Sequence, residues 1–165
     1  MTTDITKDAV EKALYMVEKG EPQYKILGCL TDAAETIAGP GSAASILVLD
    51  KDGLLRNAYS PQLPYDYLTA IDGLKPNPHL GTCASAAATG TPVITPDFKS
   101  DDKWAELRHL PLALGYIGAW SMPIKTTAGK VLGTFGTYYR EQHEPSEEEI
   151  DAVQQLADTA AMVLE

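Results

Sequence analysis

The sequence predicts an α+β fold built around an antiparallel sheet. Two pairs of short apolar segments are each joined by a turn, within residues 43–60 and 116–140. Helical patterns stand before, between and after these hairpins, and not inside them. Because neither hairpin has a crossover helix between its strands, the sequence argues against a parallel β–α–β arrangement.

Two helices are expected at the start of the chain. Asp4 and Thr6 are suitable caps for a helix over residues 7–19, which carries Val10, Leu14 and Val17 on one face. "KGEP" interrupts this helix, and Pro22 suits the first turn of a second helix that runs to about Ala38. The apolar positions of the second helix follow the helical period: Ile26, Leu27, Leu30, Ala34 and Ile37.

The first hairpin and a run of short elements follow. "GPGS" ends the second helix, residues 43–50 form an apolar strand, and "KDG" turns the chain into a second strand, "LLRNAYS". A short helix is expected in "LPYDYLTAIDG", and two prolines make "KPNPHLG" irregular. A helix of small residues, "TCASAAATG", then leads into a short strand, "PVITPDF".

The last third of the chain contains a helical segment, the second hairpin and a long helix. Residues 99–115 are expected to be helical over their first half, with Ser100 as the cap. The strands "YIGAWSMPIK" and "VLGTFGTYYR" flank the turn "TTAGK". Gly133 and Gly136 weaken a strand, so they indicate a close approach of backbone or ligand. Pro145 and Ser146 open a helix that continues to the last residue.

Composition narrows the classes of protein. The 165 residues suit one domain, and 44% apolar with 22% charged residues is typical of a globular protein. A net charge of −10, without clustered Lys or Arg, argues against nucleic-acid binding. The polar first residues do not form a signal peptide, and no apolar run approaches the length of a membrane span. Two cysteines make no disulfide framework, so we expect a cytoplasmic protein without a membrane span.

A group of motifs in residues 81–141 resembles one known family. The stretch contains "GTCASAA", a Pro-Val strand, "KWA", an arginine, "WSMPI", "GKVLGTF" and "YYRE" in this order. This set is similar to the second half of a GAF domain, and in particular to the GAF subgroup of bacterial sensor histidine kinases and cyclic-di-GMP signalling proteins. The resemblance extends over roughly residues 23–165.

The resemblance implies a fold and a general function. It implies a central antiparallel sheet with the terminal helices on one face, and a small-molecule pocket under short helices and loops on the other. The chain is then one GAF domain over 1–165, with its core at about 23–165 and an N-terminal helix in 1–20 packing with the C-terminal helix. Ala84, Ala119 and "NPH" at 77–79 depart from the subgroup's pattern, so the ligand of the relatives does not carry over.

Cys83 is the first candidate for chemistry. It lies near the start of a short helix, where the helix dipole stabilises a thiolate, so a redox or covalent role is one interpretation. The other interpretation is a small residue packed against the sheet. His79, four residues upstream, is a candidate base. Cys29, on a helix face with Ile26 and Leu30, is interpreted as structural.

A larger set of aromatic and polar residues is the candidate ligand site. Trp104 and Arg108 lie one helical turn apart, so both can face one cavity, where Arg108 would favour an anion. Alternatively, Trp104 anchors a loop and Arg108 pairs with a carboxylate. The remaining members come from the second hairpin, in which alternate residues face opposite sides of the sheet, so Tyr116 and Trp120 are expected to share one face. The candidate ligand-binding residues are Cys83, Trp104, Arg108, Tyr116, Trp120, Thr134, Thr137, Tyr139 and His79, with Ser121 beside them.

The expected function is that of a non-catalytic sensory domain, and two alternatives stay open. One is an enzyme similar to the free methionine-(R)-sulfoxide reductases, which are GAF enzymes that use a cluster of cysteines. The other is a GAF dimerisation module with a vestigial pocket. A bilin site is not favoured because Cys83 is followed by Ala84 and not by histidine. Haem and metal binding are not supported by the positions of His79 and His109.

The expected partners follow from the expected function as a sensory domain. They are an unidentified small-molecule ligand, a second copy of the chain bound through the terminal helices, and an attached or partner signalling domain such as a histidine kinase or diguanylate cyclase, as in two-component systems. No cofactor is named by the sequence. The apolar stripe of the last helix is long enough for such a dimer or for packing on its own sheet.

Overall fold

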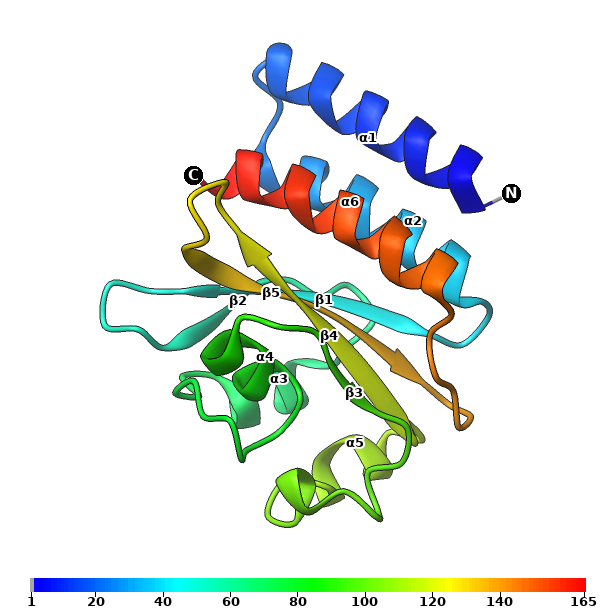
Figure 1. The fold of residues 1–165 in the computed structure, drawn as a ribbon, viewed down its shortest axis with the longest axis vertical. Coiled ribbons are helices and arrows are strands. Elements are labelled where there is room, and N and C mark those ends of the chain that lie inside the picture. Colours follow the sequence, from blue (N-terminus) through cyan, green and yellow to red (C-terminus); the bar gives the residue numbers. More distant parts are fainter. Residues whose placement is uncertain (1) are drawn as a thin grey trace.

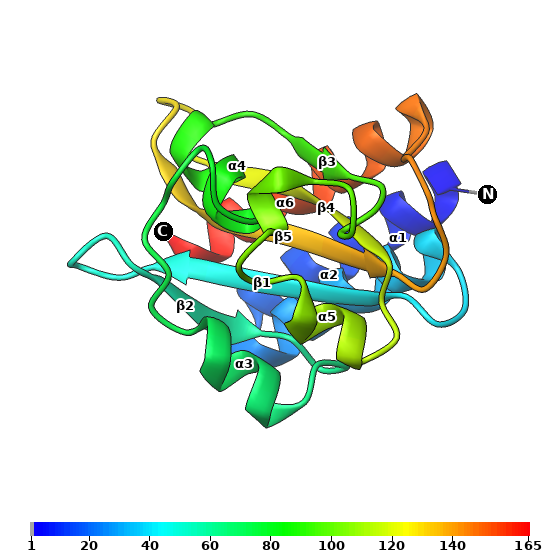
Figure 2. The same ribbon diagram turned by 90° about the horizontal axis from the view of Figure 1, so that it is seen from below.

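The computed structural model describes residues 2–165 as three layers around one sheet (Figure 1). Three long helices cover one face of the sheet: α1 (Thr2–Glu18), α2 (Gln23–Ala38) and α6 (Glu147–Leu164). The opposite face carries α3 (Tyr65–Ile71), α4 (Cys83–Thr89), the 3₁₀ turn η1 (Asp102–Trp104) and α5 (His109–Ala113), as Figure 2 shows from below. The α+β prediction is confirmed.

The sheet has five antiparallel strands in the order β2-β1-β5-β4-β3. Their bounds are β1 (Ala43–Leu49), β2 (Leu55–Tyr59), β3 (Val93–Thr95), β4 (Gly118–Lys125) and β5 (Val131–Tyr139). The two predicted hairpins are β1–β2 and β4–β5, and β5 joins them by pairing with β1. In this register Gly136 lies between Ser45 and Ser121, so all three residues face the same side.

The main core lies between the sheet and the three long helices. Trp120, Met122 and Phe135 point from the central strands into this layer, where they meet α2 and α6. Ser146 caps α6 by accepting a hydrogen bond from the Glu149 backbone N–H at 3.1 Å, and the Glu149 side chain returns a bond to the Ser146 N–H. This capping box confirms the predicted start of the helix.

The first helix differs from the prediction in its start and in its buried face. It begins at Thr2 and not at residue 7, and its buried residues are Thr6, Ala9 and Ala13. Leu14 and Val17, expected on the buried stripe, are 39% and 44% exposed. Small residues let α1 approach α2 and α6 closely. The face with Ala9 and Ala13 is therefore the one that packs against these two helices, and the larger apolar residues lie on the exposed side.

Residues 99–115 also differ from the prediction. They form η1 and the short α5, separated by turns, where one helix was expected. The cap is Asp101 and not Ser100, because the Asp101 carboxylate accepts the backbone N–H of Lys103 at 3.0 Å. Pro111 stands in the first turn of α5, where its missing N–H has no cost, but it cannot extend a helix from upstream.

Both strand glycines mark close approaches, as predicted. A Cβ on Gly133 would overlap the carbonyl oxygen of Leu47 on β1. A Cβ on Gly136 would lie 3.2 Å from the Cys83 sulfur. The backbone of β5 therefore touches a neighbouring strand at one glycine and the helix α4 at the other.

Candidate functional site

A small cavity lies between the sheet and the short helices of the second face. Its volume is about 20 Å³, which is room for about one water molecule. Two aromatic side chains, Tyr67 and Trp104, and the sulfur-bearing Cys83 form part of its wall. The whole lining is Leu47, Tyr67, Ile71, Leu74, Gly81, Thr82, Cys83, Ala84, Trp104, Leu107 and Tyr138.

Cys83 is the first residue of α4 and packs its sulfur against the backbone of β5 at Gly136. The hydroxyls of Ser121 and Thr134 lie beside this sulfur and favour its ionised form. Both side chains are fully buried, and neither hydroxyl has a hydrogen-bond partner of good geometry. Native interiors rarely leave polar atoms without partners, so these two hydroxyls are an unusual feature of the site.

Burial raises the pKa of the Cys83 thiol, and the nearby hydroxyls of Ser121 and Thr134 lower it only in part. The thiol is therefore protonated at neutral pH and is a poor nucleophile in this conformation. His79 lies in the exposed loop before α4, where its backbone N–H donates to the Asn77 side chain at 2.8 Å. It is not among the residues that line the cavity.

Two buried tyrosines close the other side of the cavity. Tyr67 of α3 and Tyr138 of β5 share a hydrogen bond of 2.7 Å between their hydroxyls, and their rings meet edge to face at 5.8 Å. Burial raises the pKa of both phenols, so both stay neutral. Sequence reasoning missed this pair. The alternation of β5 carried a signal for Tyr138, because it shares its face with Thr134 and Gly136.

Trp104 seals the cavity as part of residues 97–108, which we call the lid. Its indole N–H donates to Thr82 Oγ1 at 2.7 Å, and Thr82 Oγ1 lies 2.9 Å from Thr95 Oγ1. Thr95 in turn donates to Asp101 at 3.0 Å. This chain of hydrogen bonds ties the lid to the start of α4 and to β3, while the Trp104 ring packs on Phe98 at 4.4 Å.

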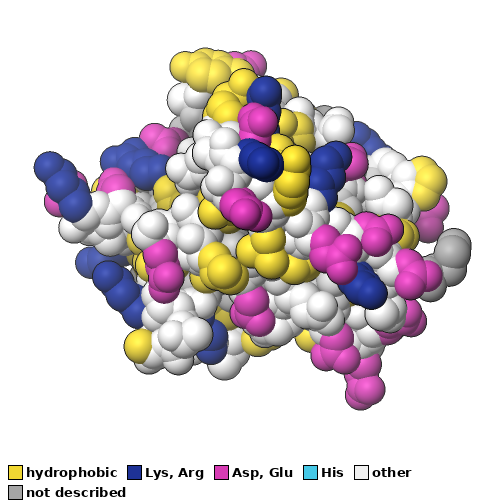
Figure 3. Space-filling model, turned by 90° about the horizontal axis from the view of Figure 1, so that it is seen from above, with side chains coloured by type: hydrophobic (Ala, Val, Ile, Leu, Met, Phe, Trp, Pro, Cys, Tyr) yellow, Lys and Arg dark blue, Asp and Glu magenta, His cyan; other side chains and the backbone are white. Residues whose placement is uncertain are grey.

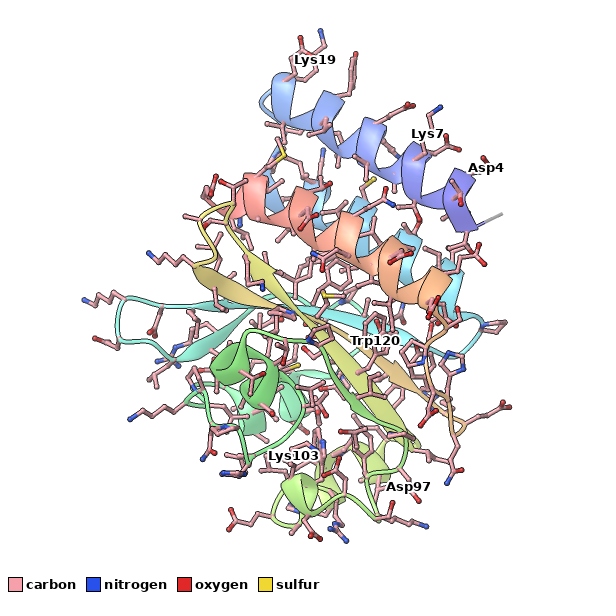
Figure 4. All side chains as sticks on the ribbon, viewed as in Figure 1. Asp4, Lys7, Lys19, Asp97, Lys103 and Trp120 are labelled. Carbon is pink, nitrogen blue, oxygen red and sulfur yellow. The ribbon has the colours of Figure 1, made fainter. Side chains whose placement is uncertain are left out.

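Asp101 is the charged end of this chain. Burial raises the pKa of its carboxyl, but hydrogen bonds from Lys103 and Thr95 outweigh burial and leave the pKa lowered. The Lys103 ammonium lies 2.9 Å from the carboxylate (its place on the lid is labelled in Figure 4). The lid is thus held by an ion pair at its rim and by neutral hydrogen bonds within.

Arg108 holds the lid together from outside the cavity. Its guanidinium donates to the backbone carbonyls of Lys99 at 2.7 Å, Asp101 at 3.3 Å and Trp104 at 3.4 Å. The structure therefore realises neither of the two arrangements expected for Arg108, since it neither lines the cavity nor pairs with a carboxylate. Trp104 does anchor the loop over the sheet, and it faces the cavity as well.

Three of the candidate residues lie on the opposite face of the sheet. Trp120 points into the layer of long helices, where its indole N–H donates to the Tyr139 hydroxyl at 2.8 Å (Figure 4). The Tyr139 hydroxyl lies 3.5 Å from Glu149 at the start of α6, and His143 lies 3.1 Å from the same carboxylate. Thr137 is buried on this side too, without a partner for its hydroxyl.

Tyr116 was expected to share a face with Trp120 and does not. β4 begins only at Gly118, so the two-residue alternation does not reach back to Tyr116. Its ring packs against Tyr138 at 5.5 Å on the side of the short helices. The structure thus places Cys83 and Trp104 on the cavity wall, with Ser121 and Thr134 beside the Cys83 sulfur, and it separates the other candidates from them.

Residues 2–165 contain neither a metal-binding cluster nor a membrane-spanning helix. No group of three or more His, Cys, Asp or Glu side chains is arranged to hold a metal ion. None of the described helices combines the length and the apolar character needed to cross a membrane.

Comparisons with known proteins agree with this architecture. A sequence model of the family described as "GAF domain" matches residues 25–165. The methyl sulfide methyltransferase-associated sensor of Methanosarcina acetivorans is 30% identical over 155 residues, which are 93% of this chain and 15% of that protein. The chain therefore spans about 15% of the length of this curated relative.

Two solved structures show the same fold. A domain from Sinorhizobium meliloti, described as belonging to a two-component sensor histidine kinase, has a TM-score of 0.69 at 22% identity and covers 84% of this chain and 87% of its own. The free methionine-R-sulfoxide reductase of Neisseria meningitidis, in complex with its substrate, has a TM-score of 0.71 at 15% identity and covers 96% and 87%.

The raised pKa of Cys83 gives a prediction for stability at alkaline pH. The folded chain keeps the thiol proton at a pH where the unfolded chain, whose thiol pKa is about 8.5, has lost it. Wild-type stability should therefore fall as pH rises through this value, relative to Cys83→Ser, by up to about 1 kcal/mol per pH unit. Urea unfolding of both proteins between about pH 7 and pH 9.5 measures this difference. Cys29 is present in both and cancels; a constant difference would contradict the prediction.

Proposed function

Because this chain belongs to the GAF domain family, we propose that it is a non-catalytic sensory domain that binds a small molecule in the cavity beside Cys83 and transmits binding to its terminal helices. The observation that carries the proposal is a pair of buried hydroxyls, those of Ser121 and Thr134, which lie beside the sulfur of the cavity residue Cys83 and have no hydrogen-bond partner of good geometry. A ligand with a polar group would complete their hydrogen bonds. The sensor named among the relatives supports the same role.

Binding requires the site to open, since the cavity of about 20 Å³ is too small for a metabolite. The lid is the element that blocks it. It is attached by the short chain of side-chain hydrogen bonds from Trp104 to Asp101 and by two backbone hydrogen bonds, from the Gly81 N–H to the Lys103 carbonyl and from the Phe98 N–H to the Ile117 carbonyl. A ligand that enters displaces the Trp104 indole and occupies its space. It selects a conformation in which the lid, α3 or both lie further from the sheet.

A route to the terminal helices exists in the two central strands. Ser121 and Thr134 lie beside the Cys83 sulfur on the face of the short helices, while their neighbours Trp120 and Phe135 face the long helices. Trp120 contacts Tyr139, which lies beside Glu149 in the first turn of α6. A shift of β4 or β5 at the cavity therefore moves groups that hold the beginning of α6.

The ligand proposal is tested by native mass spectrometry and thermal shift. We expect the protein purified under mild conditions to carry a mass that is lost on denaturation, or to be stabilised by members of a metabolite panel, with Thr134→Val weakening the effect about tenfold. Thr137→Val is the matched control, because Thr137 is equally buried and unpartnered on the opposite face of the same strand. A bare mass and no shift with any compound would contradict ligand binding.

We also propose that two copies pair through α1. Its outer side carries Leu14, Tyr15 and Val17, of which Tyr15 is 60% exposed, and Figure 3 shows apolar side chains among charged ones on this face. In two antiparallel copies of α1 crossing near Tyr15, Glu11 of one copy faces Lys19 of the other. A cytoplasmic signalling domain, such as a histidine kinase or diguanylate cyclase, would respond to the formation of this dimer.

Sedimentation velocity tests the dimer. The wild type is expected to sediment as a dimer and Leu14→Glu as a monomer, since the substitution places a charge in the apolar contact. Tyr65→Glu changes an 80% exposed apolar residue on α3, away from α1, and should remain dimeric. A monomeric wild type would contradict the pairing.

The second candidate function is a reductase of the free methionine sulfoxide type, and the thiol of Cys83 at the cavity wall favours it. Against it stands the position of Cys29, whose sulfur donates to the Ala9 carbonyl at 3.5 Å among the long helices. The sheet separates the two thiols, so they do not form a catalytic pair. NADPH consumption with thioredoxin and free methionine sulfoxide should be absent; turnover that is lost in Cys83→Ser would establish the enzyme instead.

A further inference from the structure

A second depression lies at the edge of the molecule, away from the Cys83 cavity. It opens where β1 begins and β5 ends, two points that lie side by side in Figure 2. Its volume is about 520 Å³, within the range of small-molecule sites. The lining combines the charged Glu35 and Arg140 with the polar Ser42 and Gln62 and with Pro40 and Tyr116.

Arg140 is held in a fixed position on the wall of this depression. Its guanidinium lies over the ring of Tyr116, 4.5 Å from the ring centre, and Nη1 donates to the Leu114 carbonyl at 2.8 Å. Two glycines make room for it. A Cβ would lie 3.2 Å from Arg140 Cδ at Gly41, and 2.5 Å from Nη1 at Gly115. Both glycines have positive φ, which disfavours other residues, and a Cβ at either position would displace the Arg140 side chain.

The donors of Arg140 are mostly unused. Of the chain's three arginines, Arg56 pairs with Asp50 and Asp72, and Arg108 donates to three backbone carbonyls. Arg140 makes one hydrogen bond and no ion pair with any residue of the described range 2–165. A guanidinium that is immobilised with free N–H groups is suited to bind a carboxylate through two parallel hydrogen bonds.

The other side of the depression is negative. The Glu35 carboxylate accepts the backbone N–H of Ala44 at 2.9 Å and a hydrogen bond from the Gln62 side chain, and it keeps further lone pairs. Burial raises the pKa of this carboxyl, and a cation placed beside it would oppose that shift by stabilising the ionised form. Glu35 lies in the last turn of α2, and the negative end of a helix dipole also favours a cation there. No ion pair joins Glu35 to Arg140, so the two charges line one depression without neutralising each other.

We propose that this depression binds a free α-amino acid, with its carboxylate on Arg140 and its ammonium on Glu35. The two fixed charges have opposite sign, which matches the two charged groups of a zwitterion. A zwitterion also carries no net charge, so the net charge of −10 on the chain does not repel it as it would a simple anion. The Tyr116 ring and Pro40 form the apolar part of the wall.

The test is a titration followed by ¹H–¹⁵N NMR, with pools of the common L-amino acids at about 10 mM. We expect one or more of them to shift the amide signals of Gly41, Ala44 and Gly115 with saturation. Arg140→Gln and Glu35→Gln should each weaken binding by about tenfold or more. Arg140→Lys keeps the charge but not the planar fork, and should also bind more weakly.

Controls separate this site from a general charge effect and from the Cys83 cavity. Arg56→Gln removes an arginine elsewhere and should leave the titration unchanged, as should Thr134→Val. Acetate alone and methylammonium alone should bind far more weakly than the amino acid. The proposal is overturned if no pool shifts these amides, if Arg140→Gln binds as the wild type does, or if acetate binds as well as the amino acid. Circular dichroism confirms that each variant is folded.

Discussion

The burial of β4 and β5 on both faces is the constraint on which the structure depends. Side chains of these strands face either the long helices or the short ones. Because nearly every residue is buried, the size and polarity of each side chain must fit the layer that it faces. Trp120, Met122 and Phe135 fill the larger space under α2 and α6. The other face must accept α4 at close range, so it carries Gly136, Ser121 and Thr134, and the sulfur of Cys83 takes the remaining room. The polar site is a consequence of this tight approach.

The tight approach also bears on function. The two unpartnered hydroxyls beside Cys83 are costly to keep buried, at about 1–3 kcal/mol for each group without a hydrogen bond. The closed lid compensates by packing Trp104 against Phe98 and Gly81 and by joining its indole to Thr82. Opening the lid therefore gives up the contacts of Trp104, and a bound ligand would replace them with hydrogen bonds to the two hydroxyls. A ligand that satisfies the hydroxyls shifts such an equilibrium with a small difference in free energy.

Much of the fold could be predicted from the sequence because its signals are local. The hairpin turns, the apolar periods of α2 and α6 and the Ser146–Glu149 box are each decided by a few neighbouring residues. The site was less predictable, because its members are chosen by tertiary contacts. Arg108 has helical spacing from Trp104, yet its guanidinium donates to backbone carbonyls in the 3₁₀ turn and in the segment before it. Leu14 and Val17 are exposed because of how closely α1 approaches two other helices, and the spacing of apolar residues in the sequence does not specify that distance.

The two ends of the sheet differ in how freely their loops can change. At one end Arg140 binds the 114–116 loop and packs against Gly41, so three segments of chain meet at one side chain. At the other end the turns at Gly53 and Gly129 have open space around them, with no atom within 4 Å of an added Cβ. Exposed hairpin tips of this kind tolerate added chain. A fluorescent domain or an affinity peptide inserted at residues 51–53 or 126–129 would therefore report on this protein without touching either pocket or the helices.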